Sequence, residues 1–203
     1  MSKPSSAENG NSVLGRQVYI PEHYSPKLLQ PISRADSRKD ICDHPDKKLP
    51  FVGEDLWHAY ELSWLDADGK PTIFMGQFNV PAASDFLVES KSLKLYLNSL
   101  STKSFGSSEE ARMVIATDLT EACGDIVEVT ICQIDDLSFS GAELTGQCID
   151  HYKLKSDDCN SVKEWLSYAR MENRVEECFY THFLRSICPV TKQPDWGSLW
   201  IEY

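Results

Sequence analysis

The sequence lacks any regular spacing of its cysteines. No Cys-x-x-Cys pair occurs and the number of cysteines is odd, so neither a zinc-site spacing nor a disulfide framework can be assigned. This pattern is typical of a reducing cytoplasm in which most thiols are free. The seven cysteines stand at positions 42, 123, 132, 148, 159, 178 and 188.

Long apolar runs and glycine-rich nucleotide loops are missing as well. No apolar run approaches membrane-spanning length, and the first ten residues (MSKPSSAENG) lack the apolar core of a signal peptide. Neither a Gly-x-Gly-x-x-Gly nor a P-loop pattern occurs, which leaves a Rossmann or P-loop site without support. We therefore expect a cytoplasmic protein that has no membrane partner.

Positive charge is scarce. The 203 residues include 20 Lys and Arg against 31 Asp and Glu, a net charge of -11. Such a surface repels phosphate backbones, so direct binding of nucleic acid is not expected and a small ligand in a local pocket is favoured. The length and the 41% hydrophobic content are typical of a globular protein with one or two small domains.

The chain is predicted to consist of a tail and two modules. Residues 1–13, rich in Ser, Asn and Gly, are predicted to be a disordered tail. Residues 14–150 are expected to form the first module. Within it, residues 20–50 contain five prolines, which predicts an irregular surface segment with little secondary structure. Residues 151–203 are expected to form an incomplete second module.

Alternating apolar residues predict a β-hairpin in the first module. Asp68 and Gly69 supply the tight turn between its two strands. Every second residue is apolar in each strand, which gives the hairpin one apolar face. The residues assigned to this face are Leu56, Tyr60, Leu62 and Trp64 in the first strand and Phe74, Phe78 and Val80 in the second.

Two helices and two further strands are predicted to follow. Helical spacing of apolar residues places the first helix at Ser90–Leu100, and a capping-box pattern at Ser107–Glu110 opens the second, which Gly124 ends. Strands are predicted at Asp125–Ile134 and Glu143–Ile149. The order strand, strand, helix, helix, strand, strand predicts an α+β layer with an antiparallel sheet.

The second module is predicted to be a connector and a hairpin. The connector carries a short helix at Val162–Met171, and the hairpin strands lie at Glu177–Leu184 and Trp196–Tyr203. A lone hairpin buries too little apolar surface to be stable. It must therefore pair with the first module or another chain, or continue into sequence beyond Tyr203.

Two segments carry candidate chemistry. Cys188 and Asp195 lie in a proline-flanked loop, where a thiol nucleophile and an acid can act together on an electrophilic carbon, although such a cysteine can also be a packed loop residue. Glu89 falls at a helix start and could accept hydrogen bonds from a guanine-like base. Lys91 and Lys94 could hold a phosphate, and the alternative is a capped helix with a solvated basic stripe.

Both segments resemble one enzyme family. Glu89–Tyr96 (ESKSLKLY) resembles the signature of the NADPH-dependent 7-cyano-7-deazaguanine reductases, the nitrile reductases of queuosine biosynthesis. Cys188–Trp196 (CPVTKQPDW) is similar to the nucleophile loop of that family. Weaker support comes from Leu28–Arg34 and Tyr60–Leu65, and the resemblance extends from Leu14 to Tyr203.

The resemblance implies a fold and an assembly. The family has the tunnelling fold, an antiparallel sheet backed by two helices, and this chain would hold one complete module plus the first part of a second. Chains of the two-module form are homodimers. Family members continue beyond the position of Tyr203 with two helices, a His-Glu pair and a basic segment. We therefore expect a truncated chain that is defective in hydride transfer.

The resemblance also implies site roles. Cys188 attacks the nitrile carbon to form a thioimide, Asp195 relays the proton, and two NADPH reduce the nitrile to 7-aminomethyl-7-deazaguanine without a metal. Val88, Glu89 and Ser90 would bind the deazaguanine, while Ser90 and Lys91 would contact NADPH. Two alternatives stay open: a cyclohydrolase-like pterin or purine enzyme on the same fold, which the lack of zinc ligands disfavours, and a non-catalytic module that binds a deazapurine or assembles with a partner.

Overall fold

The chain has a mixed α and β architecture with mainly antiparallel sheets. The computed structural model describes residues 23–39, 49–136, 141, 143–153, 174–188 and 191–203. It divides into two compact units, Met1–Phe139 and Ser140–Tyr203. The predicted tail at 1–13 and the predicted helix at Val162–Met171 lie outside the described residues.

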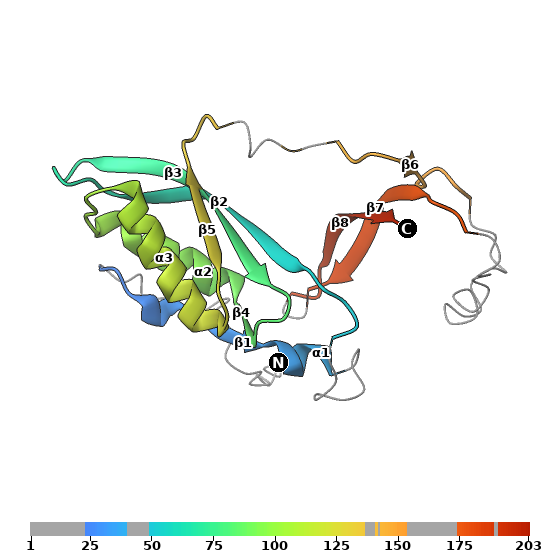
Figure 1. The fold of residues 1–203 in the computed structure, drawn as a ribbon, viewed down its shortest axis with the longest axis horizontal. Helices are drawn as coiled ribbons and strands as arrows, with labels where there is room; N and C mark the ends of the chain where they lie inside the picture. The colour runs from blue at the N-terminus through green and yellow to red at the C-terminus, as the bar shows by residue number, and fades with distance from the viewer. Residues whose placement is uncertain (1–22, 40–48, 137–140, 142, 154–173, 189–190) are drawn as a thin grey trace, which may run out of the picture. The chain divides into compact units, whose positions relative to one another are not determined.

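An antiparallel sheet backed by two helices forms the first unit. Its strands lie in the order β2 (Glu54–Leu65), β3 (Pro71–Pro81) and β5 (Glu128–Cys132). Helices α2 (Ser90–Ser99) and α3 (Ser108–Cys123) lie side by side against the sheet (Figure 1). The predicted order of strand, strand, helix, helix and strand is confirmed in this unit.

The core lies between the helices and the sheet. The apolar residues predicted for the first helix are buried, and Tyr96 and Leu100 have no exposed surface. Helix α3 begins and ends where its sequence predicts: Ser107 Oγ accepts a hydrogen bond from the Glu110 N–H at 3.1 Å, and Gly124 ends the helix at φ 72°. The largest fully buried side chains are Tyr96, Phe78, Phe105, Leu62, Leu100 and Ile115.

A β-bulge interrupts the pairing of β2 with β3. The register shifts between Ala59 and Leu62, where Tyr60 and Glu61 lie opposite Met75. Two residues on one strand thus face one residue on the other, and the extra residue reverses the alternation of side chains beyond it.

The bulge corrects the predicted apolar face of the first strand. Leu62 and Trp64 are buried as predicted, at 0% and 2% exposure, but Leu56 and Tyr60 are 52% and 60% exposed. On the far side of the bulge it is Trp57 that packs against the core. The prediction assumed that apolar residues alternate regularly along the whole strand. The bulge breaks this alternation, so Leu56 and Tyr60 lie on the exposed face.

The segment predicted to be irregular at 20–50 contains three short elements. They are the 3-10 helix η1 (Pro26–Leu28), strand β1 (Pro31–Ser33) and helix α1 (Arg34–Arg38). Strand β1 pairs antiparallel with β4 (Phe86–Val88). The prediction failed because this pairing partner lies far away in the sequence, and a three-residue strand leaves no periodic signal of its own.

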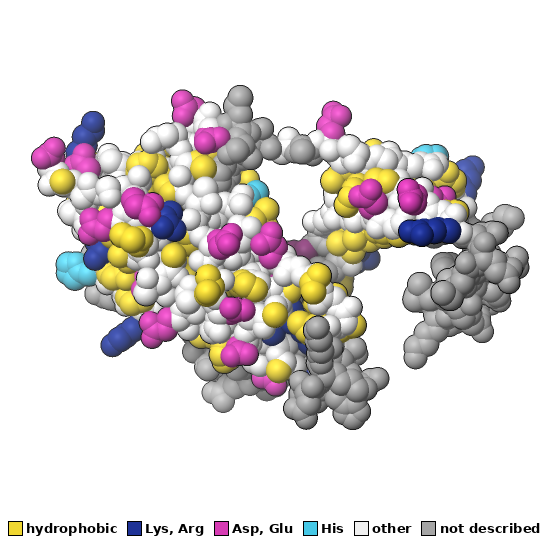
Figure 2. Space-filling model, viewed as in Figure 1, with side chains coloured by type: hydrophobic (Ala, Val, Ile, Leu, Met, Phe, Trp, Pro, Cys, Tyr) yellow, Lys and Arg dark blue, Asp and Glu magenta, His cyan; other side chains and the backbone are white. Residues whose placement is uncertain are grey.

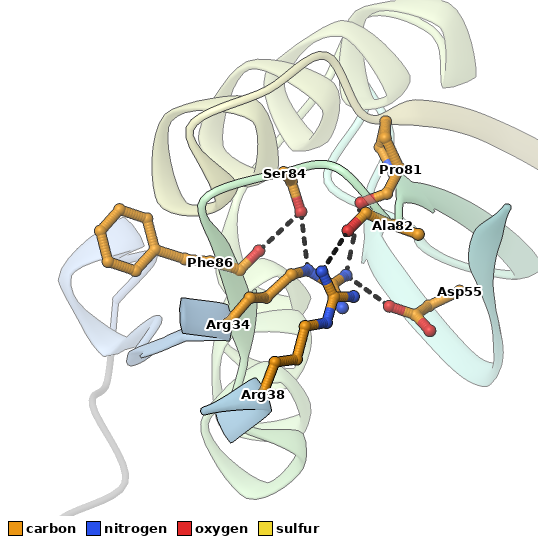
Figure 3. A network of polar contacts seen from close by, with 7 residues as sticks. All are labelled: Arg34, Arg38, Asp55, Pro81, Ala82, Ser84 and Phe86. Carbon is orange, nitrogen blue, oxygen red and sulfur yellow. Dashed lines mark hydrogen bonds and ion pairs between the residues drawn. The ribbon is translucent and has the colours of Figure 1, made fainter. Parts of the chain in front are cut away.

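A buried arginine holds the β1–β4 ribbon at the end of the sheet (Figure 3). The Arg34 side chain is 9% exposed, forms an ion pair with Asp55 and donates from Nε to Ser84 Oγ at 3.0 Å. Ser84 Oγ in turn donates to the Phe86 carbonyl at 2.9 Å, and the Arg34 N–H donates to the Asp85 carbonyl at 3.1 Å. Arg34 therefore connects α1 to the start of β2 and to the loop before β4.

Two tyrosines share one carboxylate oxygen between the helices. The hydroxyls of Tyr24 and Tyr96 each donate to Asp118 Oδ2 at 2.6 Å. Burial, and then the hydrogen bond to Asp118, raises the pKa of Tyr96 far above its ordinary value. The cluster ties the N-terminal segment to both helices.

A second three-stranded sheet forms the other unit. Strand β7 (Cys178–Ile187) pairs antiparallel with β8 (Pro194–Glu202) and parallel with the short β6 (Gln147–Cys148). The predicted hairpin is confirmed. The strand predicted at Glu143–Ile149 is corrected in its length and its place, because β6 pairs with β7 and not with the first sheet.

The surface is acidic and carries exposed apolar groups. In Figure 2 the acidic side chains are spread over the visible face of the first unit and are not gathered in one patch. Many large apolar side chains of the β7–β8 hairpin are at least 39% exposed, among them Phe183, Trp196 and Trp200. Within the described part of the chain no helix is long and apolar enough to cross a membrane.

We predict that Arg34→Ala lowers the free energy of unfolding by about 2–4 kcal/mol, because it leaves Asp55 and Ser84 without their buried partner. Arg38→Ala is the matched control, since Arg38 lies on the same short helix, donates to the Ala82 carbonyl at 2.7 Å and lies over the Phe51 ring. Its expected loss is about 1 kcal/mol or less. Urea unfolding measures both variants, and equal losses would contradict the role given to Arg34.

We predict that stability declines above pH 10 through Tyr96. The unfolded chain releases this proton near pH 10, whereas the folded chain retains it because its pKa is raised. The raised pKa of Tyr96 therefore contributes fully to the free energy of unfolding below pH 10. Above pH 10 this contribution is lost by about 1.4 kcal/mol per pH unit. Urea unfolding between pH 9 and 11 should show a shallower decline for Tyr96→Phe, and an unchanged slope would refute the assignment.

Candidate functional site

Glu89 caps helix α2 with its side chain. Its Oε1 accepts from the Lys91 N–H at 2.9 Å and its Oε2 accepts from the Ser92 N–H at 2.7 Å. These backbone groups have no partner inside the helix, so the carboxylate satisfies two of them. A carboxylate accepts about four hydrogen bonds, which leaves capacity for a ligand that donates. Glu89 and not Ser90 is therefore the residue that caps this helix.

The other residues predicted around Glu89 have different environments. Val88 is the last residue of β4, and its side chain is 5% exposed. Ser90 and Lys91 are exposed on the first turn of α2. Lys94 forms an exposed ion pair with Glu61 of the β2 bulge at 3.1 Å. The structure thus brings Val88, Glu89, Ser90 and Lys91 together at one helix start.

A groove of about 630 Å³ lies beside this helix start. It runs between α2 and the bulged strand β2, with Trp57, Leu93 and Leu97 among its apolar lining residues and Ser90 and Lys94 among its polar ones. The remaining lining residues are His58, Ala59, Tyr60, Glu61, Ser63, Ile73, Phe78 and Asn98. An apolar surface with a few polar groups at its edge is typical of small-molecule sites.

Cys188 and Asp195 lie at the turn end of the β7–β8 hairpin. Ser186 pairs with Asp195, and the Cys188 N–H continues the ladder by donating to the Gln193 carbonyl at 2.9 Å. Paired residues share a face and residues two apart share a face. Cys188 and Asp195 therefore lie on the same face in diagonal positions, which stand about 7–8 Å apart in such a ladder.

The turn itself donates a hydrogen bond to the thiol. The Thr191 N–H lies 3.5 Å from Cys188 Sγ, and the Lys192 N–H donates to the Cys188 carbonyl at 2.9 Å. Lys192 has φ 58°, in the left-handed region that a tight turn requires. This contact holds the thiol at the turn.

The chain matches one protein family closely. Residues 20–131 match the family model described as "Nitrile reductase, 7-cyano-7-deazaguanine-reductase N-term". Over 196 residues the chain is 44% identical to the NADPH-dependent 7-cyano-7-deazaguanine reductase of Teredinibacter turnerae, an alignment that covers 97% of this chain and 69% of that protein. The chain belongs to this nitrile reductase family.

Two further family members show similar identity to the chain and similar coverage. The enzyme of the same name from Chromohalobacter salexigens is 43% identical over 190 residues, which cover 94% of this chain and 68% of that protein. The one from Xanthomonas campestris pv. campestris is 45% identical over 195 residues, which cover 95% and 69%. The resemblance of the two motifs to the family is thereby confirmed.

Sequence analysis missed part of what surrounds the two candidate segments of this nitrile reductase family member. Trp57 and Asn98 line the groove, and Thr191 contacts the thiol. Ser92 could have been noted as the fourth polar residue of the signature segment, but its partner Gln30 lies far away in the sequence, just before β1. In the described ranges no group of three or more His, Cys, Asp and Glu side chains is arranged to hold a metal ion.

We predict that Glu89→Ala lowers the free energy of unfolding by about 1 kcal/mol, because both capped N–H groups lose their acceptor. Glu89→Gln should lose less, since its one carbonyl oxygen can still cap the helix. Urea unfolding of the two variants measures the difference. Equal stability of Glu89→Ala and the parent would show that the cap contributes nothing.

Proposed function

We propose that this chain reduces the nitrile of 7-cyano-7-deazaguanine to the primary amine of 7-aminomethyl-7-deazaguanine, a step of queuosine biosynthesis, and uses NADPH. The observation that carries the proposal is the placement of Cys188 and Asp195 on one face of a hairpin, with the Thr191 N–H directed at the sulfur. Membership of the nitrile reductase family supports the same reaction.

In this proposal the helix start of α2 binds the substrate base. Glu89 accepts hydrogen bonds from the amide and amine edge of the deazaguanine with the lone pairs that the helix cap leaves available. Val88 and Ser90 contribute backbone groups beside it. The buried Val88 side chain and the capped first turn favour a preformed site, because both hold the backbone in place before the ligand arrives.

The residues beside the groove fit the anionic part of a dinucleotide. Ser90 offers a hydroxyl, and Lys91 and Lys94 offer two ammonium groups on the first turns of α2. We propose that Ser90 and Lys91 contact NADPH, with Lys94 exchanging its ion pair to Glu61 for a phosphate. Each NADPH, when bound, supplies one hydride, so two NADPH in turn convert a nitrile into a primary amine.

The proposed chemistry runs through the thiol. The Cys188 thiolate adds to the nitrile carbon while the nitrogen takes a proton from Asp195, which gives a covalent thioimide. After the first reduction the C–S bond breaks and its electron pair returns to the Cys188 sulfur, leaving an imine for the second reduction. Asp195 takes a proton from solvent and can supply it to the nitrogen again. The diagonal separation of the two residues leaves room for the nitrile between them.

We also propose the tunnelling fold, a homodimer and a cytoplasmic location. The antiparallel sheet with two helices on one face supports the fold. Leu56, Tyr60 and Ile73 of the first hairpin are more than half exposed, which supports burial by a second chain. Cys123, Cys148 and Cys178 are free thiols, which supports a reducing compartment.

Intact mass spectrometry tests the proposed nucleophile. The chain is incubated with 7-cyano-7-deazaguanine without NADPH, and we expect the mass to rise by that of one whole nitrile, because addition to the thiol loses no atom. Cys188→Ala should stay unmodified. An equal adduct on Cys188→Ala would assign the chemistry to another residue, and no adduct on the folded parent would contradict the thioimide.

Oxidation of NADPH tests the complete reaction. The complete reaction consumes two NADPH per amine formed, and Asp195→Asn should lower whatever rate the parent chain shows by about 10²–10⁴ because general acid catalysis is lost. Adduct formation without any oxidation of NADPH would favour a deazapurine-binding role over reduction.

A further inference from the structure

Two buried serines on α2 make the same pair of hydrogen bonds. Ser92 Oγ donates to the Glu89 carbonyl at 2.7 Å and accepts from the Gln30 N–H at 3.0 Å. Ser92 is 1% exposed. The hydroxyl therefore joins the first turn of α2 to the residue that precedes β1.

Ser99 repeats this arrangement near the other end of the helix. Its hydroxyl donates to the Tyr96 carbonyl at 2.6 Å and accepts from the Ser25 N–H at 3.3 Å, and the residue is 3% exposed. A spacing of seven residues is about two helical turns, so both serines lie on the same face, roughly 10 Å apart. Each fastens the N-terminal segment to α2.

Of these two serines, Ser92 is the one connected to Glu89. The Glu89 N–H donates to the Gln30 carbonyl at 2.9 Å, and the Ser92 N–H donates to Glu89 Oε2 at 2.7 Å. Together with the two bonds of the Ser92 hydroxyl, these contacts form a closed ring of three residues. The ring fixes both the backbone and the carboxylate of Glu89.

We propose that Ser92 is a positioning residue that sets how well this site recognises the base of its substrate. The inference rests on the proposed role of Glu89 in binding the deazaguanine. Without the hydroxyl, the Gln30 N–H loses its acceptor, and the residue before β1 is joined to the helix start by one hydrogen bond fewer. The backbone of Glu89 is then held by fewer contacts, so its carboxylate, although still capped by the Lys91 and Ser92 N–H groups, is placed less firmly for a paired contact with an amide and an amine.

The preference for the 2-amino group tests this role. Dissociation constants are measured for 7-cyano-7-deazaguanine and for 7-cyano-7-deazahypoxanthine, which lacks the 2-amino donor. To keep binding reversible, every protein carries Cys188→Ala. We expect this parent to prefer the 2-amino ligand, and Ser92→Ala to reduce the preference about five- to tenfold, the loss of roughly one hydrogen bond.

Ser99→Ala is the matched control, because it removes the same two bonds from the same helix face. Its melting temperature should fall about as much as that of Ser92→Ala, while its preference for the 2-amino ligand stays that of the parent. The ratio of two dissociation constants does not change with the fraction of folded protein. A partly unfolded variant therefore still gives a valid result.

The outcomes separate this inference from the proposed function. If the parent prefers the 2-amino ligand and Ser92→Ala retains that preference, the positioning role is wrong and the proposed function stands. If the parent binds both ligands equally, Glu89 does not recognise the 2-amino group of the base, and the inference is overturned. If the parent binds neither ligand, the proposed function and the inference are both overturned.

Discussion

The pairing of β1 with β4 is the contact on which the helix start of α2 depends. It joins a segment before the sheet to the residues that lead into α2, and both ends of the ribbon are fastened. Arg34 binds one end to β2 and to the loop before β4, while Gln30 and Ser92 bind the other end to the helix start. Because Glu89 follows β4 directly, the pairing of β4 with β1 also restricts the position of its carboxylate.

The hairpins of the two units share a β-bulge. In each, the first strand carries a bulge shortly before the turn, at Tyr60 and Glu61 in one unit and at His182 and Phe183 in the other. The turns differ in content: the first begins with Asp66 and the second with Cys188. A paired ladder ending in a tight turn holds a thiol and a carboxylate at a fixed separation, which is what covalent catalysis with proton transfer requires.

Local signals in the sequence predicted most of the first unit. The helix spacing of Tyr96 and Leu100, the cap at Ser107 and the left-handed Gly124 depend on neighbours in the sequence, and all were confirmed. The bulge in β2, the β1–β4 ribbon and the pairing of β6 were missed, because each depends on a partner strand that the local pattern does not contain. One extra residue was enough to move Leu56 and Tyr60 out of the core.

The sequence by itself determined the family, since two short motifs carry residues whose chemistry is specific: a thiol and an acid at a turn, and a carboxylate with two lysines at a helix start. Tertiary structure alone decided what holds these groups. The sequence alone does not distinguish Ser92 from the other serines, because its contact with Gln30 is seen only in the folded chain. In the same way, the sequence does not show that Arg34 is buried in an ion pair with Asp55. Hydrogen bonds between distant segments form only once the chain is packed, and they fix the orientation of the site.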